Sequence, residues 1–176
     1  IKSLFDALND FGLRTDDESH AYLTDWDDRI SDGQTYNAHI NASKYVTDAY
    51  VESATREEVE DAQLRNESAA SRCIGLSLET RPDLLDYEEC EHLRWLGATK
   101  IQIGIQSMND QVLRMNKRGH KVAQTELAIR LLRQFGFKIH AHWMCNLYGA
   151  DVVSDIEDFD QIFSNPSVRP DELKLY

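Results

Sequence analysis

The stretch Lys100-Ile101-Gln102-Ile103-Gly104-Ile105-Gln106-Ser107 decides the fold. Isoleucine fills every second position, and Gln, Gly and Gln lie between, which is the period of a β-strand with one apolar face. The other face carries only polar side chains and a glycine, unlike the face of an ordinary core strand. The same alternation recurs further along the chain, so four strands are predicted, at 73–79, 100–106, 138–144 and 172–176. Such strands would line a polar ligand site in a parallel barrel.

Helical segments separate these strands, which predicts an α/β fold with a parallel sheet in chain order and helices covering one side. Asp86 with Glu89 and Ser154 with Glu157 are expected to begin two of the helices, and Gly97 is expected to end the first of these. The last helix should present Ile156, Phe159, Ile162 and Phe163 to the core. The predicted helices span 86–96, 109–117, 121–135 and 154–164.

The N-terminal part differs in character. Residues 1–10 read as an amphipathic helix with Ile1, Leu4, Phe5 and Leu8 on one stripe. The acidic segment 11–52 is interpreted as an external insertion, and a capped helix should run from Thr55 to about Ser71. We therefore divide the chain into 1–54, an incomplete barrel helix with the insertion, and 55–176, the later part of the barrel. A chain that opens in a helix without a preceding strand looks truncated.

Composition limits the class of protein. The chain has 176 residues, 41% hydrophobic and 28% charged, which is typical of a globular domain. Neither a bilayer-spanning apolar run nor a secretory signal is visible, so a soluble, cytoplasmic protein without a membrane partner is expected. The net charge of −12 argues against nucleic-acid binding, which relies on Lys and Arg. Cys73, Cys90 and Cys145 fit a reducing compartment and lack the close spacing of a zinc or iron–sulfur site.

Several strand-end segments, in order and at family spacing, resemble the radical S-adenosylmethionine domain of the Elongator catalytic subunit family (Elongator protein three). The resemblance covers roughly 55–176 and implies a partial (β/α)6 barrel whose N-terminal strands are missing here. In the family an acetyltransferase-like domain follows. The segments that carry the resemblance are Leu78-Glu79-Thr80-Arg81-Pro82-Asp83, 103–107, Asn116-Lys117-Arg118-Gly119-His120, 136–140, 146–149 and 169–176.

The resemblance implies an enzyme that carboxymethylates C5 of the tRNA wobble uridine. Its cofactors would be S-adenosylmethionine and a 4Fe-4S cluster, with acetyl-CoA as co-substrate. Its partners would be tRNA and either other Elongator subunits or a second copy of the chain. The family's cluster-binding cysteines lie upstream, so this chain alone is expected to hold no cluster and to be inactive. Cys145 stands where the family usually has proline.

The resemblance also implies roles for particular side chains. We expect a group of strand-end residues to bind S-adenosylmethionine, namely Glu79, Gln102, Gln106, Arg118 and His142. A second group is expected to bind substrate, namely Arg81, Lys174 and Tyr176. Catalytic residues are not assigned, and no protein ligand to a metal is expected.

Each assignment has a structural alternative. Glu79 could pair with Arg81 or with a neighbouring helix, and the two glutamines could form a polar layer of the barrel core. Arg118 could be a helix-end cation, with Gly119 as the left-handed cap and His120 as hydrogen-bonding support. His140 and His142 could ligate a metal, although a third ligand is not apparent. Lys174 needs an anion, which acetyl-CoA, a tRNA phosphate or Glu79 would supply.

Two other functions remain open from the sequence. One is a related radical enzyme similar to oxygen-independent coproporphyrinogen oxidase, although the Arg118-Gly119-His120 and 169–174 runs argue against it. The other is a barrel remnant without catalysis that serves as a binding or structural module. A cysteine triplet upstream would support either enzyme, and an acetyltransferase-like domain downstream would indicate the tRNA enzyme.

Overall fold

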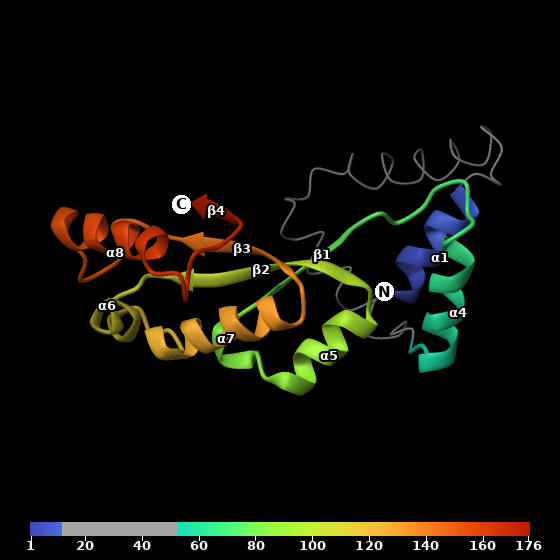
Figure 1. The fold of residues 1–176 in the computed structure, drawn as a ribbon, viewed down its shortest axis with the longest axis horizontal. Helices are drawn as coiled ribbons and strands as arrows, with labels where there is room; N and C mark the ends of the chain where they lie inside the picture. Colours follow the sequence, from blue (N-terminus) through green and yellow to red (C-terminus); the bar gives the residue numbers. More distant parts are fainter. Residues whose placement is uncertain (12–52) are drawn as a thin grey trace, which may run out of the picture. The chain divides into compact units, whose positions relative to one another are not determined.

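In a computed structural model, residues 1–11 and 53–176 are described, and they divide into two units, Ile1–Cys73 and Ile74–Tyr176 (Figure 1). The predicted acidic insertion at 11–52 lies, apart from its first residue, outside the described residues. The predicted division of the chain between residues 54 and 55 stays a prediction.

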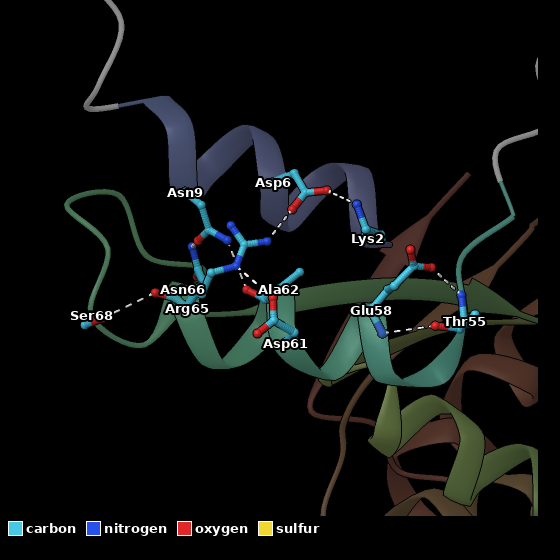
Figure 2. Close-up of polar contacts among 10 residues, drawn as sticks. All are labelled: Lys2, Asp6, Asn9, Thr55, Glu58, Asp61, Ala62, Arg65, Asn66 and Ser68. Carbon is cyan, nitrogen blue, oxygen red and sulfur yellow. Dashed lines mark hydrogen bonds and ion pairs between the residues drawn. The ribbon is translucent and has the colours of Figure 1, made fainter.

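The first unit pairs helix α1 (Lys2–Phe11) with helix α4 (Arg56–Asn66) (Figure 1). Of the predicted apolar stripe only Phe5 is buried, because a single partner helix covers a narrow strip of α1, and Ile1 and Leu4 stay exposed. The predicted capping box is confirmed: the Thr55 hydroxyl accepts from the Glu58 amide, and the Thr55 amide donates to the Glu58 carboxylate (Figure 2).

Helix α4 ends at Asn66, not near Ser71 as predicted, because the side chain of Asn66 binds the turn that follows. Its amide nitrogen donates to Asn9 Oδ1 (2.8 Å) and to the Ser71 carbonyl (3.1 Å). Its amide oxygen accepts from the Cys73 amide at 2.7 Å. The Asn9–Asn66 contact joins the two helices (Figure 2), so a polar side chain supplements the small apolar contact between them.

The second unit is built on four parallel strands in the order β1-β2-β3-β4, as predicted. The first strand begins at Leu76, so Ile74, which the predicted strand 73–79 included, precedes it and is 95% exposed. The strands are β1 (Leu76–Thr80), β2 (Ala98–Gln106), β3 (Lys138–Trp143) and β4 (Glu172–Leu175).

Helices cover the apolar face of this sheet. Helix α5 packs on β2 and α7 on β3, on the same side of the sheet (Figure 1). Gly97 and Gly136 have φ of 88° and 74°, which is the left-handed conformation expected where α5 and α7 end. The helical elements are η1 (Pro82–Leu84), α5 (Tyr87–Trp95), α6 (Asp110–Met115), α7 (Val122–Gln134) and α8 (Val152–Ser164).

The core of the second unit confirms the alternation seen in the sequence. Its strand residues are the apolar ones of each period-two pattern, and the helices add aliphatic side chains. Its buried aliphatic members include Ile101, Ile103, Ile105, Ile139, Leu93, Ile129, Leu132 and Ile162. The Gln, His and Lys residues between them therefore lie on the opposite face of the sheet.

Helix α8 departs from the prediction at its start and on its inner face. Asp151, not Ser154, is the N-cap, and its carboxylate accepts from the Ser154 amide at 2.8 Å. Of the four residues predicted to face the core only Ile162 is buried, and Ile156 is 59% exposed. The buried partner of Ile162 is Asp158, four residues earlier on the same helical face.

The longest described helices, α7 and α8, have 13 residues each. A bilayer-spanning helix needs about 20 predominantly apolar residues. Over 1–11 and 53–176, no helix is therefore long and apolar enough to cross a membrane.

Candidate functional site

The strand register brings the predicted site residues onto one polar sheet face. One row across the strands contains Glu79, Gln102, His140 and Glu172. The next row, nearer the carboxyl ends of the strands, contains Gly104, His142 and Lys174. Because all four strands run in the same direction, these rows are the consequence of the period-two pattern in each strand.

His142 and Gln102 are joined directly. The ring Nε2 of His142 lies 3.0 Å from Gln102 Oε1, while the Gln102 amide nitrogen donates to Ser77 Oγ at 3.3 Å. Burial lowers the pKa of His142, and the nearby Glu79 carboxylate, 3.6 Å from Nδ1, opposes that shift. The ring is therefore held in place and favours its neutral form.

Arg81 is paired with Asp83, so the predicted pairing of Glu79 with Arg81 was wrong. Its Nε and Nη2 donate to the two carboxylate oxygens of Asp83 at 3.0 Å and 2.5 Å. That bidentate geometry fixes the Arg81 head group against Asp83. A Cβ on Gly119 would lie 2.8 Å from Arg81 Nη2, so the loop passes close to this pair.

Arg118 lies over β2 and not at a free helix end. The left-handed residue after α6 is Lys117 (φ 53°). Its amide donates to the Arg114 carbonyl, and the Arg118 amide donates to the Leu113 carbonyl. Gly119 is therefore not the helix cap that the alternative assumed. The Arg118 Nη2 group donates to the Gly104 carbonyl at 3.3 Å. Burial, together with Arg81, lowers the pKa of Arg118.

Gln106 folds back over Gly104, next to Arg118. A Cβ on Gly104 would lie 2.8 Å from Gln106 Nε2 and 3.3 Å from Arg118 Nη2, so only glycine leaves room for both side chains. Within the described residues, Gln106 Oε1 and Arg118 Nε are buried without a hydrogen-bond partner. Two neighbouring side chains thus hold a buried acceptor and a buried cationic donor, which is unfavourable unless a ligand satisfies these atoms.

The end of β2 is bent. Gln106 has a φ of 64°, and the Ser107 amide donates to the Ile105 carbonyl at 2.8 Å, which makes residues 105–107 a γ-turn of the rare kind with positive φ. His120 Nε2 lies 3.1 Å from the same carbonyl. The buried His120 ring, whose pKa is lowered by its burial, therefore supports the turn from below the Arg118 loop.

Two carboxylates in this region were not identified as site residues from the sequence. Asp83 pairs with Arg81, and Asp158 of α8 is buried against the Ser107 hydroxyl and the Met108 amide. The sequence carries no local signal for Asp158, because among the residues three and four positions away on α8 (Ser154, Asp155, Gln161 and Ile162) only Ile162 is apolar.

Lys174, Tyr176 and His140 occupy the outer part of the polar face. The Lys174 ammonium lies 4.8 Å from the centre of the Tyr176 ring, and that ring lies 5.5 Å from the His142 ring. Hydrogen bonding to Tyr176, with the charge of Glu79, raises the pKa of Lys174. His140 Nδ1 lies 3.4 Å from Glu172. In the part of the chain that the structure describes, no three His, Cys, Asp or Glu residues are grouped to hold a metal ion.

The cysteines are separate and structural. Cys90 of α5 is fully buried, and burial raises the pKa of its thiol to about 11, with Asp86 and Glu89 adding to the shift. Cys145, the residue found where proline is usual, uses its amide to donate to the Tyr176 carbonyl at 3.3 Å. Proline could not make that bond, which connects the ends of β3 and β4.

Comparisons with known proteins agree with this geometry. The chain is 38% identical over 118 residues to a tRNA uridine(34) acetyltransferase of Dehalococcoides mccartyi, and 37% identical over 122 residues to the human Elongator complex protein 3. These matches cover 67% and 69% of this chain but 26% and 22% of the relatives. The chain thus spans about a quarter of the length of the curated relatives it matches.

Among solved structures, the archaeal Methanocaldococcus infernus Elp3 superposes with a TM-score of 0.65 at 40% identity, over 66% of this chain and 28% of that one. The coproporphyrinogen III oxidase HemN of Escherichia coli superposes with a TM-score of 0.55 at 17% identity, over 69% of this chain and 28% of that one, which shows a shared fold. Residues 22–161 match the radical SAM superfamily. With a parallel sheet of the predicted order and a match over most of its length, the chain belongs to the radical SAM superfamily.

Proposed function

We propose that the intact protein is a radical S-adenosylmethionine enzyme that carboxymethylates C5 of the tRNA wobble uridine, with acetyl-CoA as co-substrate. One observation carries the proposal. Gln106 and Arg118 both crowd Gly104 with their terminal nitrogens, and each of these side chains also holds a buried atom without a hydrogen-bond partner, Oε1 and Nε respectively. The chain that carries them is 38–40% identical to proteins named tRNA uridine(34) acetyltransferase. Neither acetyl-CoA nor the carboxymethyl product follows from those names, so both belong to the proposal.

The site residues fit S-adenosylmethionine. Its carboxylate would satisfy the buried Arg118 Nε, and a hydroxyl or amino group would satisfy Gln106 Oε1. His142, placed by Gln102, and Glu79 offer further acceptors to the nucleoside part. When bound together with a 4Fe-4S cluster, S-adenosylmethionine supplies hydrogen-atom abstraction. In this proposal the ligands of the cluster are none of Cys73, Cys90 and Cys145.

Substrate contacts are proposed at the outer edge of the site. Lys174 and Tyr176 lie at the carboxyl end of β4, where an ammonium group could hold a phosphate of acetyl-CoA or of tRNA. Arg81 could do the same if its pairing with Asp83 opens. Because the chain carries a net charge of −12, tRNA binding would depend on such local cations and on other parts of the protein. We place the enzyme in the cytoplasm, with further Elongator subunits or a second copy as partners.

The test uses the intact protein with its cluster reconstituted anaerobically. S-adenosylmethionine, acetyl-CoA, tRNA and a reductant are supplied, and the nucleosides of the digested tRNA are identified by mass spectrometry. We expect a carboxymethyl group at C5 of the wobble uridine, and 5′-deoxyadenosine release that depends on acetyl-CoA. Omission of acetyl-CoA, and a tRNA with cytidine at the wobble position, are the controls.

Different outcomes separate the competing functions. Cleavage of S-adenosylmethionine that leaves the wobble uridine unmodified would reject the tRNA reaction. Decarboxylation of coproporphyrinogen III by the same preparation would favour the coproporphyrinogen-oxidase-like alternative. A protein that binds no S-adenosylmethionine would favour the non-catalytic alternative.

A further inference from the structure

The amide of Gln106 occupies its place over Gly104 only because the backbone turns sharply there. The γ-turn at 105–107 puts a non-glycine residue at φ 64°. Such a conformation costs about 1–3 kcal/mol and persists only where surrounding contacts enforce it. The contacts around Gln106 therefore decide where its side chain points.

Two contacts come from within the sheet and the adjacent loop. The Met144 amide donates to the Gln106 carbonyl at 2.9 Å, and His120 lies against the Ile105 carbonyl at 3.1 Å. Both act on residues 105 and 106. Neither fixes the chain after the turn, which must leave the sheet toward α6.

The remaining contacts come from Asp158 on α8. Its Oδ2 accepts from the Ser107 hydroxyl and from the Met108 amide, the latter at 2.8 Å. The Ser107 oxygen in turn accepts from the Asn109 amide at 3.0 Å, and Asn109 is the N-cap of α6. A single carboxylate oxygen thus fixes the segment that follows Gln106 as far as the first turn of the next helix.

Burial of the Asp158 carboxylate is not explained by its contribution to stability alone. It is 4% exposed and lies four residues from the core residue Ile162, and the two donors on its Oδ2 are neutral. A buried carboxylate held by neutral donors contributes little stability compared with an apolar side chain of similar size. Its value must lie in what it holds, because both donors belong to the residues directly after Gln106.

We propose that Asp158 is a positioning residue for the S-adenosylmethionine site, which fixes segment 107–109 and thereby keeps the Gln106 amide over Gly104. The inference rests on the proposed function, since it takes Gln106 to contact the nucleoside. Asp158 itself does not touch the ligand. It acts through its hydrogen bonds to Ser107 and Met108.

The experiment compares Asp158→Leu and Asp158→Asn with the intact wild-type protein. Leucine fills the space beside Ile162 but removes the acceptor, whereas asparagine keeps one oxygen that can accept from Ser107 or Met108. Three quantities are measured: amide hydrogen exchange at 107–109, the dissociation constant for S-adenosylmethionine by titration calorimetry without turnover, and the unfolding midpoint. Asp160→Leu is the matched control, because Asp160 is an exposed aspartate on the same helix.

In Asp158→Leu we expect faster exchange confined to 107–109, and a dissociation constant raised about tenfold, the effect of losing about 1.4 kcal/mol. Its unfolding midpoint should stay close to that of Asp160→Leu. Asp158→Asn should recover part of the affinity. If Asp158→Leu does not fold, Ser107→Ala replaces it and should show the same pattern of local exchange.

Unaltered affinity in Asp158→Leu, or a loss of affinity that only parallels a general loss of stability, would overturn the inference. Failure of the proposed function looks different. In that case the wild-type protein itself does not bind S-adenosylmethionine, and the exchange at 107–109 still decides whether Asp158 holds the segment.

Discussion

His142 Nε2 donates to Gln102 Oε1 across 3.0 Å, and this bond determines which nitrogen of the neutral ring carries the proton. The Gln102 amide nitrogen is directed to Ser77, so its oxygen is the acceptor. The unprotonated Nδ1 then lies 3.6 Å from a carboxylate oxygen of Glu79. Two acceptors side by side would be bridged by one donor, such as an amino or hydroxyl group of a bound ligand.

Stability should fall as the pH falls through the histidine range. Burial lowers the pKa of His142 and of His120 below the ordinary value of 6.5. Below about pH 6.5 the unfolded chain therefore binds more protons than the folded chain, so acidification favours unfolding until the folded rings are also protonated. Each unit of pKa difference is worth about 1.4 kcal/mol.

Urea unfolding of the chain between about pH 5 and pH 7.5 measures this dependence. His142→Asn should reduce the pH dependence of the free energy of unfolding by the contribution of His142. His120→Asn should reduce it by the contribution of His120. A free energy of unfolding that is independent of pH in this range would contradict the lowered pKa values.

Gly104→Ala should impair ligand binding more than folding. The new methyl group would lie 2.8 Å from Gln106 Nε2 and 3.3 Å from Arg118 Nη2, and both atoms are at the ends of flexible side chains that can move away. The free energy of unfolding should change by no more than about 1 kcal/mol. Affinity for S-adenosylmethionine, titrated in the intact protein, should fall because both side chains leave their positions.

Gly75→Ala is the matched control, because its methyl group would meet only Thr99 Oγ1 at an ordinary 3.4 Å. Gly75→Ala should bind S-adenosylmethionine with the same affinity as the wild-type protein. Equal affinities in the two alanine variants would show that the crowding at Gly104 has no part in binding.

Arg118→Ala should weaken binding of S-adenosylmethionine by about 1.5–3 kcal/mol, the usual contribution of a hydrogen bond to a charged group. Gln106→Ala should cost about 0.5–1.5 kcal/mol, because a neutral amide contact is weaker. The measurement is cofactor titration and 5′-deoxyadenosine release by the intact, reduced enzyme. Arg114→Ala, an exposed arginine on α6, serves as the control. Full affinity in Arg118→Ala would reject the carboxylate contact.

Much of this fold could be predicted from local patterns. Period-two alternation placed the strands of the sheet to within a few residues, and capping residues such as Thr55 and Asp86 placed helix starts correctly. These features depend on residues close in the sequence. Ile74 and Ile156 show the limit: each continues an apolar pattern but is exposed, because an element's neighbours, not its own sequence, decide how far its buried face extends.

The site shows the same limit. The sequence placed Glu79, Gln102 and His142 on one face, since alternation fixes the side on which a strand residue lies. It could not predict that Arg81 pairs with Asp83, because that choice depends on how the chain turns after β1. The buried contact between Ser107 and Asp158 joins residues 51 apart in sequence, and no local pattern encodes such a partner.

Asn66→Ala should destabilise the first unit by about 1–3 kcal/mol, because it leaves partly buried backbone groups without this partner. Asn66 is 3% exposed, and its side chain binds Asn9, the Ser71 carbonyl and the Cys73 amide. Arg65→Ala is the comparison: its ion pairs with Asp6 and Asp61 are exposed (Figure 2), so the loss should be clearly smaller. Helix content monitored by circular dichroism during urea unfolding would distinguish them, and an equal loss in both would contradict the role given to Asn66.

Lys117→Gly should stabilise the chain. Lys117 has a φ of 53° at the end of α6, where its amide donates to Arg114 and completes the helix cap. A residue with a Cβ is disfavoured in this left-handed conformation by about 1–2 kcal/mol, and glycine removes that cost while keeping the backbone bond. Because glycine also increases the freedom of the unfolded chain, a net gain of about 1 kcal/mol in the free energy of unfolding is expected. Lys121→Gly, at φ −114° in the same connecting segment, should lower the free energy of unfolding by about 0.5–1 kcal/mol. This glycine increases the conformational freedom of the unfolded chain without relieving backbone strain in the folded one. Urea unfolding of the two variants measures the difference, and a loss of stability in both would show that the conformation of Lys117 is not strained.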